Sequence, residues 1–163
     1  EQNGPEALPF RSPEPEEALT ARLHIGNQVS KVLELRTRLD WGWATPAGQT
    51  EQTGMVLLQD VIFQPIEFPL SFTARFALLD TDGYAMRFYH FENDLLNAFS
   101  IPAYYNQGSR FYLNVRFRPM RNLTLEARFA RTYWSNQEAI GTGLEAIDGQ
   151  YRTQVSSQIK WVF

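Results

Sequence analysis

The feature that most constrains the fold of this chain is a two-residue alternation of apolar and polar side chains that recurs from Leu19 to Phe163. In the segment PLSFTARFALL, for example, Leu70, Phe72 and Phe76 alternate with polar residues. Successive side chains of a β-strand point to opposite faces, so this period is typical of a strand, whereas a helix repeats about every 3.6 residues. Because no segment shows a convincing helical stripe, the sequence predicts an all-β, antiparallel chain.

The alternating segments are long. They run over residues 19–27, 31–43, 69–79, 109–119, 122–132 and 155–163, and a further segment at 54–64 is apolar on both faces. Strands of about 9–11 residues match the tilted span of a bilayer, whereas strands in soluble proteins average about 5–6 residues. This length favours a membrane-spanning barrel over the alternative, a soluble β-sandwich.

The two faces of these strands differ in charge. The apolar face is nearly free of charge, which suits lipid, and the polar face suits the wet interior of a barrel. We therefore expect the following charged residues to face a lumen: Glu34, Arg36, Arg38, Asp40, Arg75, Arg110, Arg116, Arg118, Glu126 and Arg128.

Aromatic residues gather near the expected strand ends, where tyrosine and tryptophan form girdles at membrane interfaces. The interfacial candidates next to the long connections are Trp41, Trp43, Tyr104, Tyr105, Tyr133 and Trp134.

These patterns predict an antiparallel transmembrane outer-membrane β-barrel over residues 18–163, with eight to ten strands in this chain, or a sector of a larger barrel. Residues 1–17 differ in composition, with five acids, one arginine and four of the nine prolines. That composition predicts an acidic, Pro-rich tail or linker. The chain has no cysteine, which excludes disulfides and thiolate metal sites.

The last strand suggests an orientation. Val155, Ile159, Trp161 and Phe163 resemble the C-terminal sorting signal that outer-membrane barrels present to the barrel-assembly machinery, with Phe163 on the periplasmic side. The tight turns at 27–31, 64–69 and 119–122 are then periplasmic, and the loops at 45–54, 102–109 and 135–150 are extracellular. With these sides assigned, the chain between the flanking strands must cross the membrane an even number of times or not at all. Residues 84–101 therefore form either two short strands or an extracellular hairpin.

Three segments carry a family resemblance: ENDLLNAFSIPAYY (92–105), GSRFYLNVRFR (108–118) and IGTGLEAIDG (140–149). They are similar to the C-terminal β-barrel region of Bacteroidota-type outer-membrane proteins that carry N-terminal helix-hairpin-helix repeats. Those barrels are longer and the helix-hairpin-helix part is absent here, so the resemblance implies a fragment, a split partner or a small relative. It implies no catalytic residue.

The sequence predicts a structural or pore-forming role in the bacterial outer membrane, as a subunit or C-terminal part of an envelope complex. The expected partners are the lipid bilayer, the assembly machinery and other envelope proteins or the missing N-terminal part of a larger barrel, with no direct nucleic-acid site. The alternative is a channel for DNA or solute uptake, in which the inward arginines line an open lumen. In the other interpretation these arginines pair with acids and fill the lumen.

Enzymatic and metal chemistry are disfavoured. His24 and His90 are the only histidines, and no serine is spaced to nominate a partner for either. The DTDG segment at 80–83 begins like a calcium loop but lacks further acids at the required spacing, so we interpret it as a turn with Gly83 at positive φ. We expect no cofactor, no metal and no catalytic residue.

Overall fold

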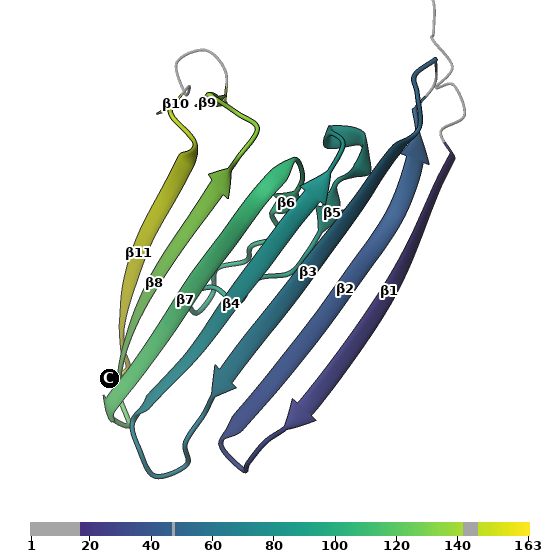
Figure 1. Cartoon of the computed structure of the whole chain (residues 1–163). Helices are drawn as coiled ribbons and strands as arrows, with labels where there is room; N and C mark the ends of the chain where they lie inside the picture. The colour runs from purple at the N-terminus through teal and green to yellow at the C-terminus, as the bar shows by residue number, and fades with distance from the viewer. Residues whose placement is uncertain (1–16, 47, 142–146) are drawn as a thin grey trace, which may run out of the picture.

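The fold is a curved antiparallel β-sheet of seven long strands (Figure 1). The computed structural model describes residues 17–46, 48–141 and 147–163. Residues 1–16 of the predicted tail lie outside the described residues, as do parts of the predicted loops 45–54 and 135–150, namely Ala47 and residues 142–146.

The seven strands contain 11 to 14 residues each. In sheet order they are β1 (Glu17–Gln28), β2 (Leu33–Thr45), β3 (Gln52–Phe63), β4 (Leu70–Thr81), β7 (Gln107–Met120), β8 (Leu123–Trp134) and β11 (Tyr151–Trp161). The shorter elements are the 3-10 turn η1 (Tyr84–Met86) and the two-residue strands β5 (Phe88–Tyr89), β6 (Ala103–Tyr104), β9 (Ala139–Ile140) and β10 (Ile147–Asp148).

The connections alternate between the two ends of the sheet. The connections at 29–32, 64–69 and 121–122 lie at one end, and those at 46–51, 82–106 and 135–150 start from the other end (Figure 1). The predicted alternation of short and long connections is confirmed except at 46–51, which is no longer than the turn at 64–69. The predicted loop at 102–109 is wrong in its bounds, because β6 lies within it and β7 already begins at Gln107.

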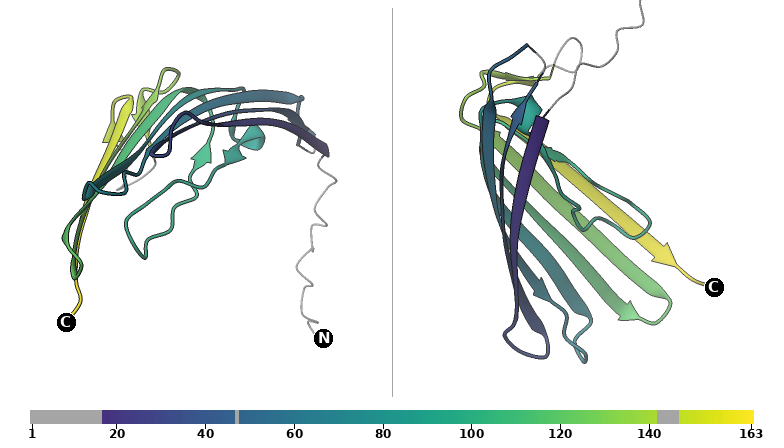
Figure 2. Two further views of the ribbon diagram at one scale, coloured as in Figure 1. Left: turned by 90° about the horizontal axis from the view of Figure 1, so that it is seen from below. Right: turned by 90° about the vertical axis from the view of Figure 1, so that its right-hand side faces the viewer.

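The sheet has seven strands within the described residues, so the prediction of eight to ten barrel strands is wrong. Residues 82–106 do not cross the sheet but form an insertion between β4 and β7, in which β5 pairs with β6 and Glu92 bridges to Ser100. We call residues 82–106 the hairpin. It lies inside the curve of the sheet (Figure 2), where its backbone is bound by sheet side chains. Of the two predicted alternatives, residues 84–101 therefore belong to a hairpin and do not form two crossing strands.

The sheet is open. β1 and β11 are its two edges, and within the described residues each pairs with a neighbour on one side only. Viewed along the strands, the sheet forms an arc (Figure 2). The expected all-β antiparallel sheet is confirmed, but a closed barrel within this chain is not what the structure shows. Among the described residues, no helix is both long enough and apolar enough to cross a bilayer.

The hairpin covers part of the concave face and creates the buried core. The buried apolar residues of this core are Ala44, Val56, Leu58, Ala77, Leu79, Met86, Phe88 and Tyr104. Gly54 permits the close approach of η1, since a Cβ at this position would lie 2.7 Å from Met86 Cγ and 2.9 Å from Thr81 Cγ2. The packing of η1 against β3 therefore depends on the absence of a side chain at Gly54.

The convex face carries the apolar residues of the alternation and leaves them exposed. The strand registers place one residue of each pair on the same face, as in the row of Leu39, Leu57 and Leu78. The large convex side chains that are more than a third exposed are Leu19, Leu23, Ile25, Trp41, Met55, Leu57, Phe76, Leu78, Phe111, Phe117, Phe129, Tyr151, Val155, Ile159 and Trp161. No described element covers this face.

Candidate functional site

The centre of the concave face is the carboxylate of Glu92, which the hairpin places under the sheet with no exposed area. Arg110 Nε donates to Oε1 at 2.6 Å and Arg110 Nη2 donates to Oε2 at 2.7 Å. Arg128 Nη2 donates to Oε2 at 2.5 Å, and Tyr104 Oη donates to Oε1 at 2.5 Å. Both oxygens of one buried carboxylate are thus bound by two arginines and a tyrosine.

The strands β7 and β8 position these two arginines. Arg110 lies opposite Thr132 in the register, and Arg128 lies opposite Asn114, so both arginines share the concave face of neighbouring strands. Arg110 Nη1 also donates to Thr132 Oγ1 at 2.6 Å, which fixes the guanidinium plane. A bidentate pair of this kind is stronger and more directional than a single contact.

A second buried pair joins β3 to β4. Asp60 and Arg75 are direct cross-strand neighbours, with Nε to Oδ1 at 2.5 Å and Nη2 to Oδ2 at 2.8 Å. The remaining Nη1 of Arg75 donates to the backbone oxygen of Phe91 at 2.7 Å. The Tyr112 ring lies near the guanidinium groups of Arg75 and Arg128, at 5.6 Å and 5.4 Å. This pair therefore ties the hairpin backbone to the sheet.

A third contact holds the tip of the hairpin. Glu126 accepts a hydrogen bond from Arg116 Nε at 2.5 Å and another from the backbone N–H of Leu96 at 2.7 Å. Asn114 Nδ2 donates to the backbone oxygen of Asp94 at 2.8 Å. Backbone groups that have no partner within the hairpin are thus satisfied by side chains of the sheet.

A fourth group surrounds His90, which is 1% exposed. Arg38 Nη1 lies 3.3 Å from His90 Nδ1, and His90 Nε2 lies 3.5 Å from Asp40 Oδ2. Asp40 in turn accepts two hydrogen bonds from Arg22 Nε and one from Nη2, the shortest 2.7 Å. Burial lowers the pKa of His90 to about 4, and the charge of Asp40 only partly opposes this. His90 is therefore neutral at neutral pH.

Burial and hydrogen bonding oppose each other at Glu92. Burial by itself raises the pKa of the carboxyl, but the hydrogen bond and charge of Arg110 and the hydrogen bond of Tyr104 outweigh it, so the pKa lies below the usual range. Burial and the neighbouring carboxylate raise the pKa of Tyr104. The pair is thus an ionised acid and a neutral phenol that donates to it.

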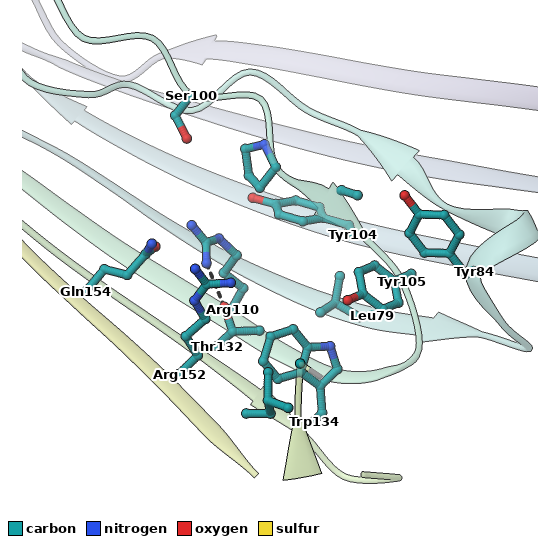
Figure 3. Close-up of a pocket in the computed structure, with 14 residues that line it drawn as sticks. Leu79, Tyr84, Ser100, Tyr104, Tyr105, Arg110, Thr132, Trp134, Arg152 and Gln154 are labelled. Atoms are coloured by element: carbon teal, nitrogen blue, oxygen red, sulfur yellow. Dashed lines mark hydrogen bonds between the residues drawn. The ribbon is translucent and has the colours of Figure 1, made fainter. Parts of the chain in front are cut away.

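Figure 3 shows a recess of about 430 Å³ beside this network, between the hairpin and the inner sides of β7, β8 and β11. Arg110, Arg152 and Gln154 line one wall, and Tyr104 and Trp134 lie among the aromatic residues of the other walls. The lining contains neither histidine. Within the described residues, no group of acids and histidines is arranged to hold a metal ion.

The structure brings together nine of the ten predicted lumen-facing charges on one face. The registers place these nine at concave positions: Glu34, Arg36, Arg38, Asp40, Arg75, Arg110, Arg116, Glu126 and Arg128. Arg118 lies at the irregularity of β7 between Phe117 and Met120, where the register assigns it no partner. Most of the ten form ion pairs, including Glu34 with Arg36 at 2.7 Å. Arg38 and Arg118 take part in no ion pair within the described part of the chain.

The predicted interfacial aromatics divide between the faces. Trp41, Trp43 and Tyr133 occupy convex positions near one end of the sheet. Tyr104 and Trp134 are buried on the concave side, 1% and 7% exposed, so they do not share an outer band with the first three. Tyr105 belongs to the same inner group, because it packs on Trp134 with ring centroids 6.3 Å apart.

The residues of the predicted assembly signal lie at the β11 edge. Val155, Ile159 and Trp161 point to the convex side and are 75%, 74% and 50% exposed. Phe163 follows the end of β11 and is fully exposed.

The DTDG segment forms a different turn from the predicted one. Gly83 has φ 176°, which is extended backbone, so the prediction of a positive φ is wrong. Asp82 acts on another strand instead: its Oδ2 accepts hydrogen bonds from Thr53 N at 2.7 Å and Thr53 Oγ1 at 2.8 Å. The aspartate fastens the start of the hairpin to β3.

Sequence reasoning missed the residues that organise the site. Glu92, Asp60 and Tyr112 were not among the predicted charged or aromatic positions. The available signal was the segment around Glu92, where an acid stands among aromatic residues in a stretch that fits no regular crossing.

A search of protein-family models, of curated proteins and of solved structures finds no match to this chain.

Proposed function

We propose that this chain is a wall of an outer-membrane β-barrel whose hairpin fills part of the lumen. The observation that carries the proposal is the inverted distribution of side chains. Charged residues such as Glu92 and Arg128 are buried on the concave face, while leucines and phenylalanines are exposed over the convex face.

Contact of the convex face with lipid would explain why its apolar side chains are exposed while charged side chains are buried on the concave face. Soluble monomers rarely expose a contiguous apolar patch of more than a few hundred Å². Here the apolar face extends over all seven strands. It is interrupted near its middle by Gln59, whose amide is bound to Thr37 at 2.7 Å and to the Arg36 carbonyl at 3.2 Å, and toward the end with the longer connections by the charged residues Asp80 and Arg131. A satisfied polar side chain at such a position is compatible with an apolar solvent.

Strand length and the placement of aromatics support the same proposal. Strands of 11 to 14 residues are at least as long as a tilted bilayer crossing requires. Trp41 and Trp43 lie near one convex rim and Trp161 near the other, as interfacial aromatics do.

The role that fits best is structural or plugged-pore, within an envelope complex inserted by the barrel-assembly machinery. The ion pairs of the concave face favour a filled lumen over an open conducting one. The resemblance of 92–105 and 108–118 to the barrels of the helix-hairpin-helix family stays a prediction.

The test uses the four tryptophans. Two variants keep a single tryptophan, Trp43 or Trp134, and replace the others by phenylalanine; both are reconstituted into phosphatidylcholine vesicles with brominated acyl chains. We expect strong quenching of Trp43 and weak quenching of Trp134, because only the first faces the convex side. Equal quenching of the two, or a chain that stays monomeric in buffer without detergent, would contradict the proposal.

A further inference from the structure

The two edges of the sheet leave backbone groups without partners. Within the described residues, β1 and β11 each form a ladder on one side only. In lipid, every backbone N–H and C=O must be paired, because no water is present to bind them. If the convex face contacts lipid, both edges therefore require another strand.

The number of strands limits what can close the sheet. Six successive antiparallel pairings join β1 to β11, so these two strands run in the same direction. A seam between β11 and β1, in one chain or between two copies related by rotation about the barrel axis, is therefore parallel. Closure with antiparallel ladders throughout, as in bacterial barrels with even strand numbers, needs an odd number of additional strands.

The inner side of β11 carries two positively charged side chains that have no ion-pair partner within the described residues. Its concave residues are Arg152, Gln154, Ser156, Gln158 and Lys160. Neither cation forms an ion pair within the described part of the chain, whereas Arg110, Arg116 and Arg128 on the adjoining strands do. Figure 3 shows Arg152 on the same side of the sheet as Arg110, next to the recess.

A second copy of this chain does not supply the missing charges. The concave residues of β1 are Ala18, Thr20, Arg22, His24, Gly26 and Gln28, with no carboxylate among them. The β1 edge of another copy would thus meet β11 in a parallel ladder and add Arg22 to the inner face that already carries Arg152 and Lys160.

We propose that β11 is completed by an amphipathic strand of a partner polypeptide, antiparallel to β11 and part of an odd-numbered closing set. Its outer side chains are apolar, and its inner face carries carboxylates opposite Arg152 and Lys160. These two residues lie eight positions apart in β11, so the carboxylates have the same spacing. The inference rests on the proposed membrane location and names the kind of partner that completes the barrel.

The experiment uses disulfide trapping, which is unambiguous because the chain has no cysteine. Ser157→Cys is placed on the outer side of β11 in the full chain, in phosphatidylcholine vesicles. The probes are two synthetic 13-residue peptides with alternating leucines and one outer cysteine. One peptide has glutamates at the two inner positions eight apart, and the other has lysines there.

We expect the acidic peptide to be trapped at least about fivefold more than the basic one, since each of two ion pairs contributes roughly 0.5 kcal/mol. The double variant Arg152→Glu/Lys160→Glu reverses the preference. A chain without residues 1–16 serves as a control, because that stretch also carries carboxylates. Equal trapping of both peptides would overturn the inference, as would a covalent dimer between Ser157→Cys and Ala21→Cys copies.

The two proposals fail in different ways. Quenching of Trp43 by brominated lipid without a peptide preference would overturn only the acidic partner strand. Absence of that quenching would overturn the membrane location, whatever the peptides do. A chain that forms its sheet in vesicles only when the acidic peptide is present supports the inference, because it shows that the open edge prevents insertion.

Discussion

The convex and concave faces of this sheet are built from alternate residues of the same seven strands, yet apolar side chains are exposed on one and charged side chains are buried on the other. Leu57 on the convex face is 38% exposed, while its neighbour Leu58 on the concave face is 1% exposed and belongs to the core. On the concave side, Asp60 and Arg75 are buried as an ion pair. A side chain of this sheet is therefore buried where the hairpin covers it, whether that side chain is apolar or charged.

Pairing makes the concave face possible. Removal of one member of a buried ion pair is strongly destabilising, because it leaves an uncompensated charge, whereas the intact pair adds little stability over an apolar substitute. The network around Glu92 is thus a means of holding one hairpin position, since the hairpin supplies the acid and the sheet supplies the bases. The convex face has no such internal partner and depends on its surroundings.

The strongest test of this comparison is Glu92→Gln. The change leaves Arg110 and Arg128 buried without a full negative charge, so we expect a loss of about 3–5 kcal/mol in the free energy of unfolding. It is measured by urea unfolding in detergent, with proteolysis of residues 82–106 as a second readout. Glu51→Gln at an exposed position is the control. Unchanged stability and unchanged proteolysis would show that the network does not hold the hairpin.

A charge on the convex face is the next test. Leu57→Arg places a guanidinium near the middle of the apolar surface, where we expect a cost of about 2–4 kcal/mol in a bilayer. The matched control is Ser156→Arg, which lies on the exposed concave side of β11. Folding efficiency into vesicles is measured for both variants. Equal insertion of the two variants would show that the convex face is not in lipid, because the charge would then cost the same on both faces.

The close approach of the hairpin is tested by Gly54→Ala. The added methyl group meets Met86 Cγ at 2.7 Å, so we expect a loss of about 1–3 kcal/mol from overpacking. The control is Gly26→Ala in β1, where the nearest atom to a Cβ is 3.9 Å away. Thermal unfolding in detergent distinguishes them. Restoration of stability by the double variant Gly54→Ala/Met86→Ala would identify η1 as the cause, and a Gly54→Ala variant as stable as Gly26→Ala would contradict the packing.

The smallest expected effect is a pH dependence from His90. Its pKa is about 4 in the folded chain and about 6.5 when unfolded, so the unfolded state binds the proton first as pH falls. Stability is therefore greatest above pH ~6.5 and falls by about 1 kcal/mol between pH ~7 and ~5.5, because the unfolded chain takes up the proton there and the folded chain does not. His90→Gln should flatten this slope in urea titrations. The slope should persist in His24→Gln, and a slope that persists in His90→Gln would assign it to another group.

Much of the fold follows from the sequence because the period of two is local information. The alternation identified six of the long strands, and Pro and Asn residues marked the connections at one end of the sheet. Strand count failed at residues 84–101, because those residues alternate too weakly to reveal that they leave the sheet. The acid partners of Arg75 and Arg110 were also missed, since Asp60 and Glu92 meet them only through register and insertion.

The sequence by itself determined that most of the long strands have one apolar and one polar face, because side-chain direction alternates along any extended backbone. Only the tertiary structure decided which charges are buried, since the position of the hairpin depends on many weak contacts between residues far apart in the chain. It also decided that the sheet is open, because the parity and the pairing of β1 and β11 are properties of all seven strands together. An apolar alternation is the same in a closed barrel and in an arc.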